Sequence, residues 1–170
     1  MKDAKILFVI VFAAIAGVVA WRLLRQDVAV HELSLARADN TDHVPTLAEL
    51  RGKVVLLEFW EAKAGQSHQA ISGLIDLHEK HSPEGLVIIA VTTEPKTEVD
   101  TVVDAMKIPY IIGYDDAGRT SRAYNVTRKP WAFLIGRDGT VRWHGHPGFV
   151  PHDKIKAVLA ETCPAAVADE

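Results

Sequence analysis

Three strongly hydrophobic runs lie along the middle of the chain, and the first contains one charged residue, Glu58. The runs are VVLLEFW at residues 54–60, LVIIAVTT at residues 86–93 and the shorter YIIGY at residues 110–114. Continuous apolar runs of this kind are typical of strands that are covered on both faces. We therefore predict a central buried strand, a second buried strand, and a third segment that is either strand or loop.

Between and after these runs the apolar residues recur every three or four positions, the period of an amphipathic helix. This spacing predicts helices over residues 67–81, 96–107, 119–125 and 152–162. Two further strand-like stretches, WAFLI and VRWHGH, flank Asp138-Gly139, which is a strong hairpin signal. Alternating strands and helices followed by a hairpin predict an α/β fold, with a central mixed β-sheet flanked by helices on both faces.

The N-terminal region has a different pattern. Residues 6–21 carry no charge, and Arg22 follows them directly. We predict that residues 6–24 form a transmembrane or signal-anchor helix, with Trp21 as an interfacial residue. A signal peptide cleaved after Ala20 is the alternative, and a buried core helix is a third. The first two place the rest of the chain on the periplasmic or extracytoplasmic side of the cell membrane.

These patterns divide the chain into four parts. Residues 1–25 are the predicted anchor, residues 26–45 a polar linker with at most one short strand, residues 46–162 the α/β domain, and residues 163–170 a tail. Thr46 and Glu49 have the spacing of a capping box and predict a short helical turn at the start of the domain.

The net charge and the cysteine content argue against some partners and some covalent bonds. The net charge is −3, and removing residues 1–25, whose four cations and one acid contribute +3, leaves −6. Proteins bind the phosphates of nucleic acid through clustered Lys and Arg, and the negative net charge does not fit this requirement. We therefore expect no nucleic-acid partner. The single cysteine, Cys163, cannot form an intramolecular disulfide. It is either an inert tail residue or the site of an intermolecular bond.

From Leu47 to Leu159 the chain resembles the thioredoxin superfamily, in particular the membrane-anchored TlpA/ResA-type branch of thiol-disulfide proteins. The matching segments are LAELRGKVVLLEFW, GLVIIAVTTE and VTRKPWAFLIGRDGTVRWHGHPG. The resemblance implies a thioredoxin-like fold, a cis peptide bond before Pro130, and a Cys-x-x-Cys motif where strand 54–60 meets the next helix. At those motif positions this chain has Ala64-Gly65-Gln66-Ser67, with Lys63 before them.

Without thiols the turn cannot carry out disulfide exchange, in which one thiolate attacks and a second resolves the mixed disulfide. We therefore expect no catalytic residue here, and Ser67 is interpreted as an N-cap or first-turn residue. The alternative is a thiol-disulfide oxidoreductase of the cell envelope, if the cysteines at positions 64 and 67 were engineered away or Cys163 replaces them.

The scaffold of such a site could still bind a protein or peptide in the envelope, because the backbone before a cis proline can pair with an extended peptide. The predicted binding groove consists of Trp60, Lys63, Gly65, Gln66, Ser67, His68, Lys129, Pro130 and Trp131.

Two further features carry ionisable groups. Glu58 interrupts the central strand and is predicted to be a partly buried acid whose pKa is raised by desolvation, unless Lys63 or another cation reverses the shift. His144 and His146 alternate on a strand and, with His68, are weak candidates for a metal site built on imidazoles alone. We expect packing or surface roles for them, and neither a metal nor another cofactor.

Overall fold

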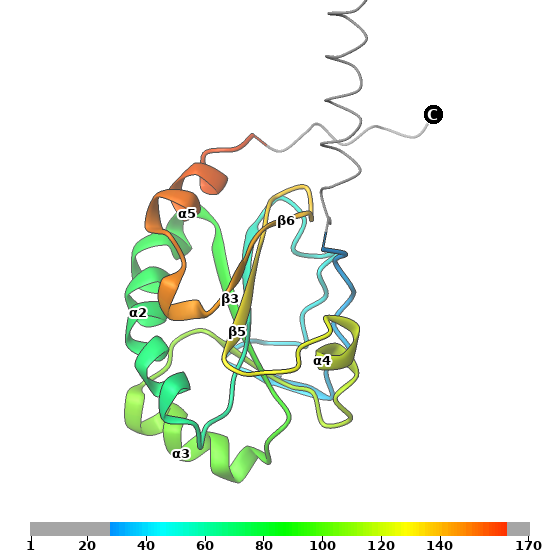
Figure 1. Ribbon diagram of the computed structural model, residues 1–170, viewed down its shortest axis with the longest axis vertical. Helices are drawn as coiled ribbons and strands as arrows, with labels where there is room; N and C mark the ends of the chain where they lie inside the picture. The colour runs from blue at the N-terminus through cyan, green and yellow to red at the C-terminus, as the bar shows by residue number, and fades with distance from the viewer. Residues whose placement is uncertain (1–27, 163–170) are drawn as a thin grey trace, which may run out of the picture.

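A six-stranded sheet organises residues 28–162, the part of the chain that this computed structural model describes (Figure 1). The strand order is β1-β4-β3-β2-β5-β6. Strands β2, β3 and β4 run parallel, whereas β1 and the hairpin of β5 and β6 pair antiparallel with their neighbours, so the sheet is mixed as predicted. The strands are β1 (Arg37–Asp39), β2 (Val54–Phe59), β3 (Leu86–Thr92), β4 (Ile111–Tyr114), β5 (Trp131–Ile135) and β6 (Val141–Gly145).

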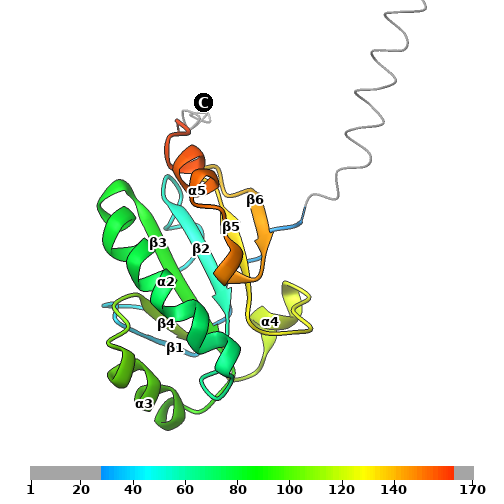
Figure 2. The ribbon, with the colours of Figure 1, turned by 60° about the vertical axis from the view of Figure 1, so that its left-hand side comes forward.

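Helices cover both faces of this sheet, which confirms the predicted layers. The helices α2, α3 and α5 pack on one face, and α4 lies on the other (Figures 1 and 2). The helical elements are α2 (Gly65–His81), η1 (Ser82–Glu84), α3 (Lys96–Met106), α4 (Arg119–Ala123), η2 (Pro147–Phe149) and α5 (His152–Leu159). Their bounds lie within three residues of the predicted ones, because strong periodicity locates helices better than it locates their ends.

Strand β2 is the centre of the core, and all six of its residues are buried. Leu56 packs in the cluster under α2 and α5, while Leu57 points to the opposite cluster, which includes Tyr124. A strand that is covered on both faces has no position for an exposed polar residue, which explains why β2 is apolar at every position except the buried Glu58. Burying each leucine stabilises the fold by about 2 kcal/mol.

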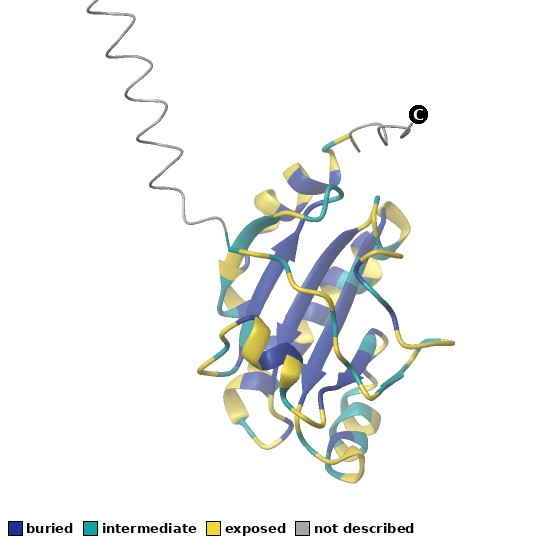
Figure 3. Ribbon diagram, turned by 90° about the vertical axis from the view of Figure 1, so that its right-hand side faces the viewer, coloured by how far each residue is buried: buried dark blue, intermediate teal, exposed yellow. Residues whose placement is uncertain are grey.

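The second face of the sheet is covered by the chain before β1. The side chains of Val28, Val30, Leu33 and Leu35 pack against the cluster on that face. Figure 3 shows the chain crossing this face of the sheet. The hydroxyl of Tyr124 donates to the carbonyl of His31 at 2.7 Å and fastens the segment there. The described part of the expected linker is thus packed onto the domain. No strand forms over residues 28–35, and the short strand β1 begins at Arg37 instead.

Two local predictions can be compared with the structure directly. The Glu49 carboxylate accepts from the Thr46 amide at 3.0 Å, and the Thr46 hydroxyl accepts from the Glu49 amide at 3.2 Å, so the capping box forms around a hydrogen-bonded turn. The hairpin forms around Asp138-Gly139, with an irregularity in the pairing between Leu134 and Ile135. Because of this shift, Val141 and Trp143 pack on opposite faces of the sheet although they are two residues apart.

The predicted membrane segment, residues 6–24, and Cys163 lie outside the described residues. None of the helices within residues 28–162 combines the length and the hydrophobicity that a membrane span needs.

Candidate functional site

The turn between β2 and α2 lies at the carboxyl end of the central strand. Ala64 is the N-cap of α2, and its side chain makes no capping hydrogen bond. Within residues 28–162 the amide N–H groups of Gly65 and Gln66 have no acceptor. No acidic residue occupies the first turn. The start of α2 therefore presents unpaired N–H donors and the positive end of the helix dipole.

Ser67 holds this turn together from below. It is fully buried, and its hydroxyl accepts from the Glu61 amide at 3.2 Å. Ser67 lies in the first turn of α2, as predicted. Ala64 carries no nucleophilic atom, and within residues 28–162 no basic side chain is hydrogen-bonded to the buried Ser67 hydroxyl to activate it.

The second wall of the site is the segment before β5. The Lys129–Pro130 peptide bond is cis, as the resemblance implied. In the antiparallel register Trp131 lies opposite Phe59, the last residue of β2, so Pro130 is brought beside the turn that follows. The Lys129 amine donates to the Thr93 hydroxyl at 3.1 Å and lies 3.7 Å from the Glu61 carboxylate. This lysine links the ends of β3, β2 and β5.

The predicted groove residues separate into a floor and a rim. The buried floor consists of Trp60, Ser67 and Pro130, and Trp60 has only 1% of its surface exposed. The rim, exposed or half-buried, consists of Lys63, Gly65, Gln66, His68, Lys129 and Trp131. Trp60 therefore supports the groove from beneath and is not itself a surface for a partner.

Two acidic residues outside the predicted set, Glu94 and Glu98, complete the turn. The Glu94 carboxylate accepts from the Ala62 amide, and Glu98 forms an ion pair with Lys63 at 2.8 Å. The Glu98 carboxylate raises the pKa of the Lys63 amine. Glu94 follows β3, whose carboxyl end lies beside that of β2, so the parallel pairing of two predicted strands could have identified it.

Glu58 lies beneath the turn on the central strand. It is completely buried, neither carboxylate oxygen has a hydrogen-bond partner, and desolvation raises its pKa to about 8. This confirms the predicted direction, although burial is complete and not partial. Lys63 does not reverse the shift, because it pairs with Glu98. The pKa of Tyr110 is raised first by its own burial and then by the charge of Glu58.

The three candidate metal-ligating histidines occupy separate environments. His144 lies on β6, with its ring centroid 6.0 Å from that of Trp131. His146 lies beyond the end of β6, where its Nδ1 accepts from the Gly148 amide, so the predicted alternation along one strand does not apply to it. A ring nitrogen of His68 lies 2.5 Å from the Ala62 carbonyl oxygen. No cluster of three or more His, Cys, Asp or Glu suited to a metal ion occurs among residues 28–162.

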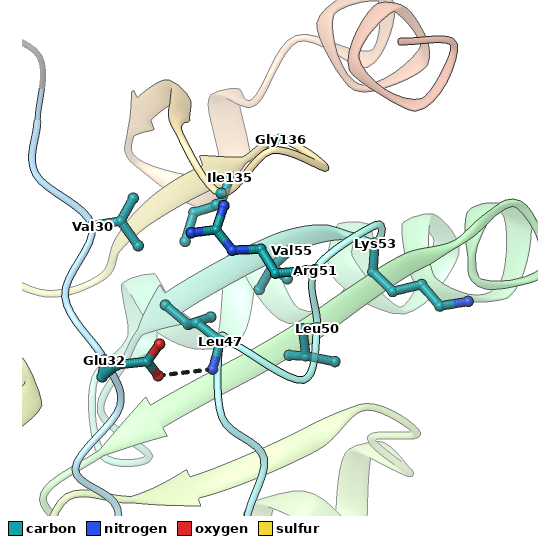
Figure 4. Close-up of a pocket in the computed structure, with 10 residues that line it drawn as sticks. Val30, Glu32, Leu47, Leu50, Arg51, Lys53, Val55, Ile135 and Gly136 are labelled. Carbon is teal, nitrogen blue, oxygen red and sulfur yellow. Dashed lines mark hydrogen bonds between the residues drawn. The ribbon is translucent and has the colours of Figure 1, made fainter. Parts of the chain in front are cut away.

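A hollow of about 270 Å³ lies at the other end of the sheet and is separate from this turn. Its lining includes Val30, Leu47 and Ile135 with the cationic Arg51 (Figure 4). The Glu32 carboxylate accepts from the Leu47 amide at 3.0 Å, and the Arg51 guanidinium donates to the Asp138 carbonyl. These polar groups are satisfied within the fold. The hydrogen bond between Glu32 and Leu47 joins the residues before β1 to the rest of the domain.

Comparisons with known proteins agree with this geometry. The model of the AhpC/TSA family matches residues 28–144. The chain is 30% identical over 105 residues to the thiol-disulfide oxidoreductase ResA of Geobacillus kaustophilus, which covers 61% of this chain and 60% of the relative. It is 26% identical over 151 residues to ResA of Bacillus cereus, covering 83% and 87%.

Solved structures show the same fold. A putative thiol:disulfide interchange protein DsbE from Chlorobium tepidum superposes with a TM-score of 0.68 at 26% identity, over 80% of this chain and 99% of the other. A thioredoxin-like superfamily protein superposes with a TM-score of 0.70 at 23% identity, over 81% and 99%. The thioredoxin-like fold is therefore established for the described residues.

Proposed function

We propose that this chain, which belongs to the AhpC/TSA family of thioredoxin-like proteins, binds a protein or peptide partner and does not exchange disulfides. The contact surface is the rim of the groove between the start of α2 and the cis-Pro130 segment. The partner gains backbone donors from Gly65 and Gln66, and at the edge of the groove it meets the Lys63–Glu98 and Lys129–Glu61 ion pairs.

One observation carries the proposal. The turn retains the buried Glu58, the cis proline and the uncapped helix start, yet its side chains at positions 64 and 67 are a methyl and a buried hydroxyl. A hydroxyl cannot take part in thiol–disulfide exchange. Backbone recognition beside a cis proline needs no sulfur, so binding can persist where the redox reaction does not.

We place this activity at the extracytoplasmic side of the cell membrane. The support is the uncharged run at residues 6–21, which is consistent with an anchor or an export signal. The partner is accordingly a protein or peptide of the cell envelope.

The second candidate is a thiol-disulfide oxidoreductase, and its support is the name ResA given to the relatives. For this chain the thiol would have to come from Cys163. Replacing Cys163 should abolish the activity of an oxidoreductase, but it should leave partner binding at the groove unchanged.

The binding proposal can be tested with a photoreactive amino acid at Gln66, which is exposed at the start of α2. The matched control carries the same group at Glu79, exposed at the far end of α2. We expect irradiation of cells that express the full chain to give a discrete adduct from position 66 and none from position 79. The same adduct should form when Cys163 is replaced by Ser. Equal labelling from both positions, or an adduct that requires Cys163, would contradict the proposal.

A further inference from the structure

A second hollow opens on the face of the sheet that α4 covers, behind the cis-proline segment. It has a volume of about 270 Å³, and its lining residues come mainly from the loop that follows α4 and from the hairpin of β5 and β6. It shares only Trp131 with the groove beside α2, and it is formed by Tyr124, Thr127, Arg128, Trp131, Phe133 and His144 among others.

Aromatic rings form one side of this hollow. The ring centroids of Trp131 and His144 lie 6.0 Å apart, and those of Phe133 and His144 lie 6.0 Å apart with their planes at 30°. The Phe133 ring packs in turn against Tyr124 at 5.1 Å. Because Phe133 and Tyr124 are buried in the core, the more exposed Trp131 and His144 rest on a rigid support. Such a surface suits contact with a flat ring.

The charge of the hollow is positive. The Arg128 guanidinium carbon lies 5.2 Å from the centroid of the Trp131 ring, and the arginine is exposed. Within residues 28–162, no Asp or Glu lines the hollow and Arg128 has no carboxylate partner. The Thr127 hydroxyl and the His144 imidazole add possible donors. An anion entering the hollow would therefore meet donors and no like charge.

We propose that this hollow is a binding site for an aromatic carboxylate. The ring of the ligand lies against Trp131 and His144, and its carboxylate accepts two parallel N–H donors from Arg128. Arginine suits this role because its planar fork matches a carboxylate and also stacks on aromatic faces. A volume of about 270 Å³ is close to the small end of ligand sites, which fits a ligand with a single ring. The same chemistry occurs in a free aromatic acid and in a peptide that ends in an aromatic residue.

NMR titration of the ¹⁵N-labelled protein separates these sources. Benzoate represents the free acid, N-acetyl-L-phenylalanine represents the peptide end, and benzamide is the uncharged control. We expect saturable shifts of the Trp131 indole and of the amides of residues 124–128 with at least one of the two carboxylates. Benzamide should bind at least tenfold more weakly than the better carboxylate.

The matched variants are Arg128→Gln and Arg122→Gln. Arg122 is exposed on the neighbouring α4 and does not line the hollow. We expect Arg128→Gln to weaken carboxylate binding at least tenfold, while Arg122→Gln leaves it unchanged and both variants keep the native spectrum. The proposal would be overturned by linear, unsaturated shifts with both carboxylates, by equal binding of benzamide, or by equal loss in the two variants.

Discussion

Glu58 lies directly opposite Ala132 in the antiparallel register of β2 and β5. The buried carboxyl is therefore placed two residues along the sheet from the cis proline and beneath the turn that begins α2. Neither of its oxygens has a hydrogen-bond partner in the described residues. An acid in this setting destabilises the fold when it ionises, because the charge has left water without gaining a compensating partner.

The first prediction concerns pH. Desolvation raises the pKa of Glu58 from 4.5 to about 8, so the folded state holds this proton more tightly than the unfolded state does. Stability from this group is full below about pH 4.5, falls as the pH rises, and levels off above about pH 8. The loss across that window is at most about 5 kcal/mol, at about 1.4 kcal/mol for each pH unit.

The variant Glu58→Gln should abolish this slope, because its amide cannot ionise. We expect the free energy of unfolding of the variant to exceed that of the wild type by a margin that grows from pH 5 to pH 8. Urea denaturation at several pH values measures this. Parallel pH profiles for the two proteins, or an NMR titration that gives Glu58 a pKa below 5, would show that the carboxyl is not held neutral.

Much of this arrangement could be predicted from sequence. The apolar runs at residues 54–60 and 86–93 located the two central strands, because only a doubly covered strand is apolar on both faces. The Asp138-Gly139 pair located the hairpin, because its turn geometry favours these residue types. The cis bond at Pro130 followed from family resemblance alone.

Other features depend on contacts that no local pattern contains. The residues before β1 look like a linker because polar and charged residues are mixed with the apolar ones, and their packing depends on Tyr124, 93 residues away from His31. The pairing of Lys63 with Glu98 joins the turn to α3 across 35 residues, and an exposed lysine gives no sign of its partner. The second hollow likewise combines a loop with a hairpin.

The second prediction concerns the buried hydroxyl of Ser67. The variant Ser67→Ala removes the acceptor of the Glu61 amide and should lower the free energy of unfolding by about 1 kcal/mol. Ser72→Ala is the matched control, since Ser72 is exposed on the same helix and should change stability by no more than about 0.5 kcal/mol. Equal effects in thermal denaturation would mean that the Ser67 hydroxyl does not stabilise the turn.

The third prediction concerns the arginine that joins the hairpin to the end of α5. The Arg142 guanidinium contacts the Glu161 carboxylate at 2.8 Å and the Asp138 carboxylate at 2.9 Å. Because these groups are partly exposed, solvent screening limits the loss in Arg142→Ala to about 1 kcal/mol. Arg122→Ala, which breaks no ion pair within residues 28–162, should have a smaller effect. Urea denaturation of both variants checks the order, and a larger loss in Arg122→Ala would contradict it.

The fourth prediction concerns Phe149, an exposed aromatic residue at the end of η2. Phe149 is 79% exposed, although Pro147 and Val150 on either side are buried and η2 packs against α2. A phenylalanine held outward in this way costs little to remove, so Phe149→Ser should leave the free energy of unfolding within about 0.5 kcal/mol.

We expect the same substitution to lower the yield of the adduct formed from a photoreactive group at Gln66, because a partner on the groove would also cover this ring. An unchanged yield would place Phe149 outside the contact surface. A large loss of stability would show that its ring packs within the fold.

The most direct test of the central claim is an insulin-reduction assay with three proteins: the wild type, Cys163→Ser and the double variant Ala64→Cys/Ser67→Cys. We expect the wild type and Cys163→Ser to be equally inactive, because neither has a thiol at the start of α2. The double variant should reduce insulin, since the helix start, the buried Glu58 and the cis proline are already in place. Turnover by the wild type that is lost in Cys163→Ser would contradict the proposal that this chain binds a partner and does not exchange disulfides.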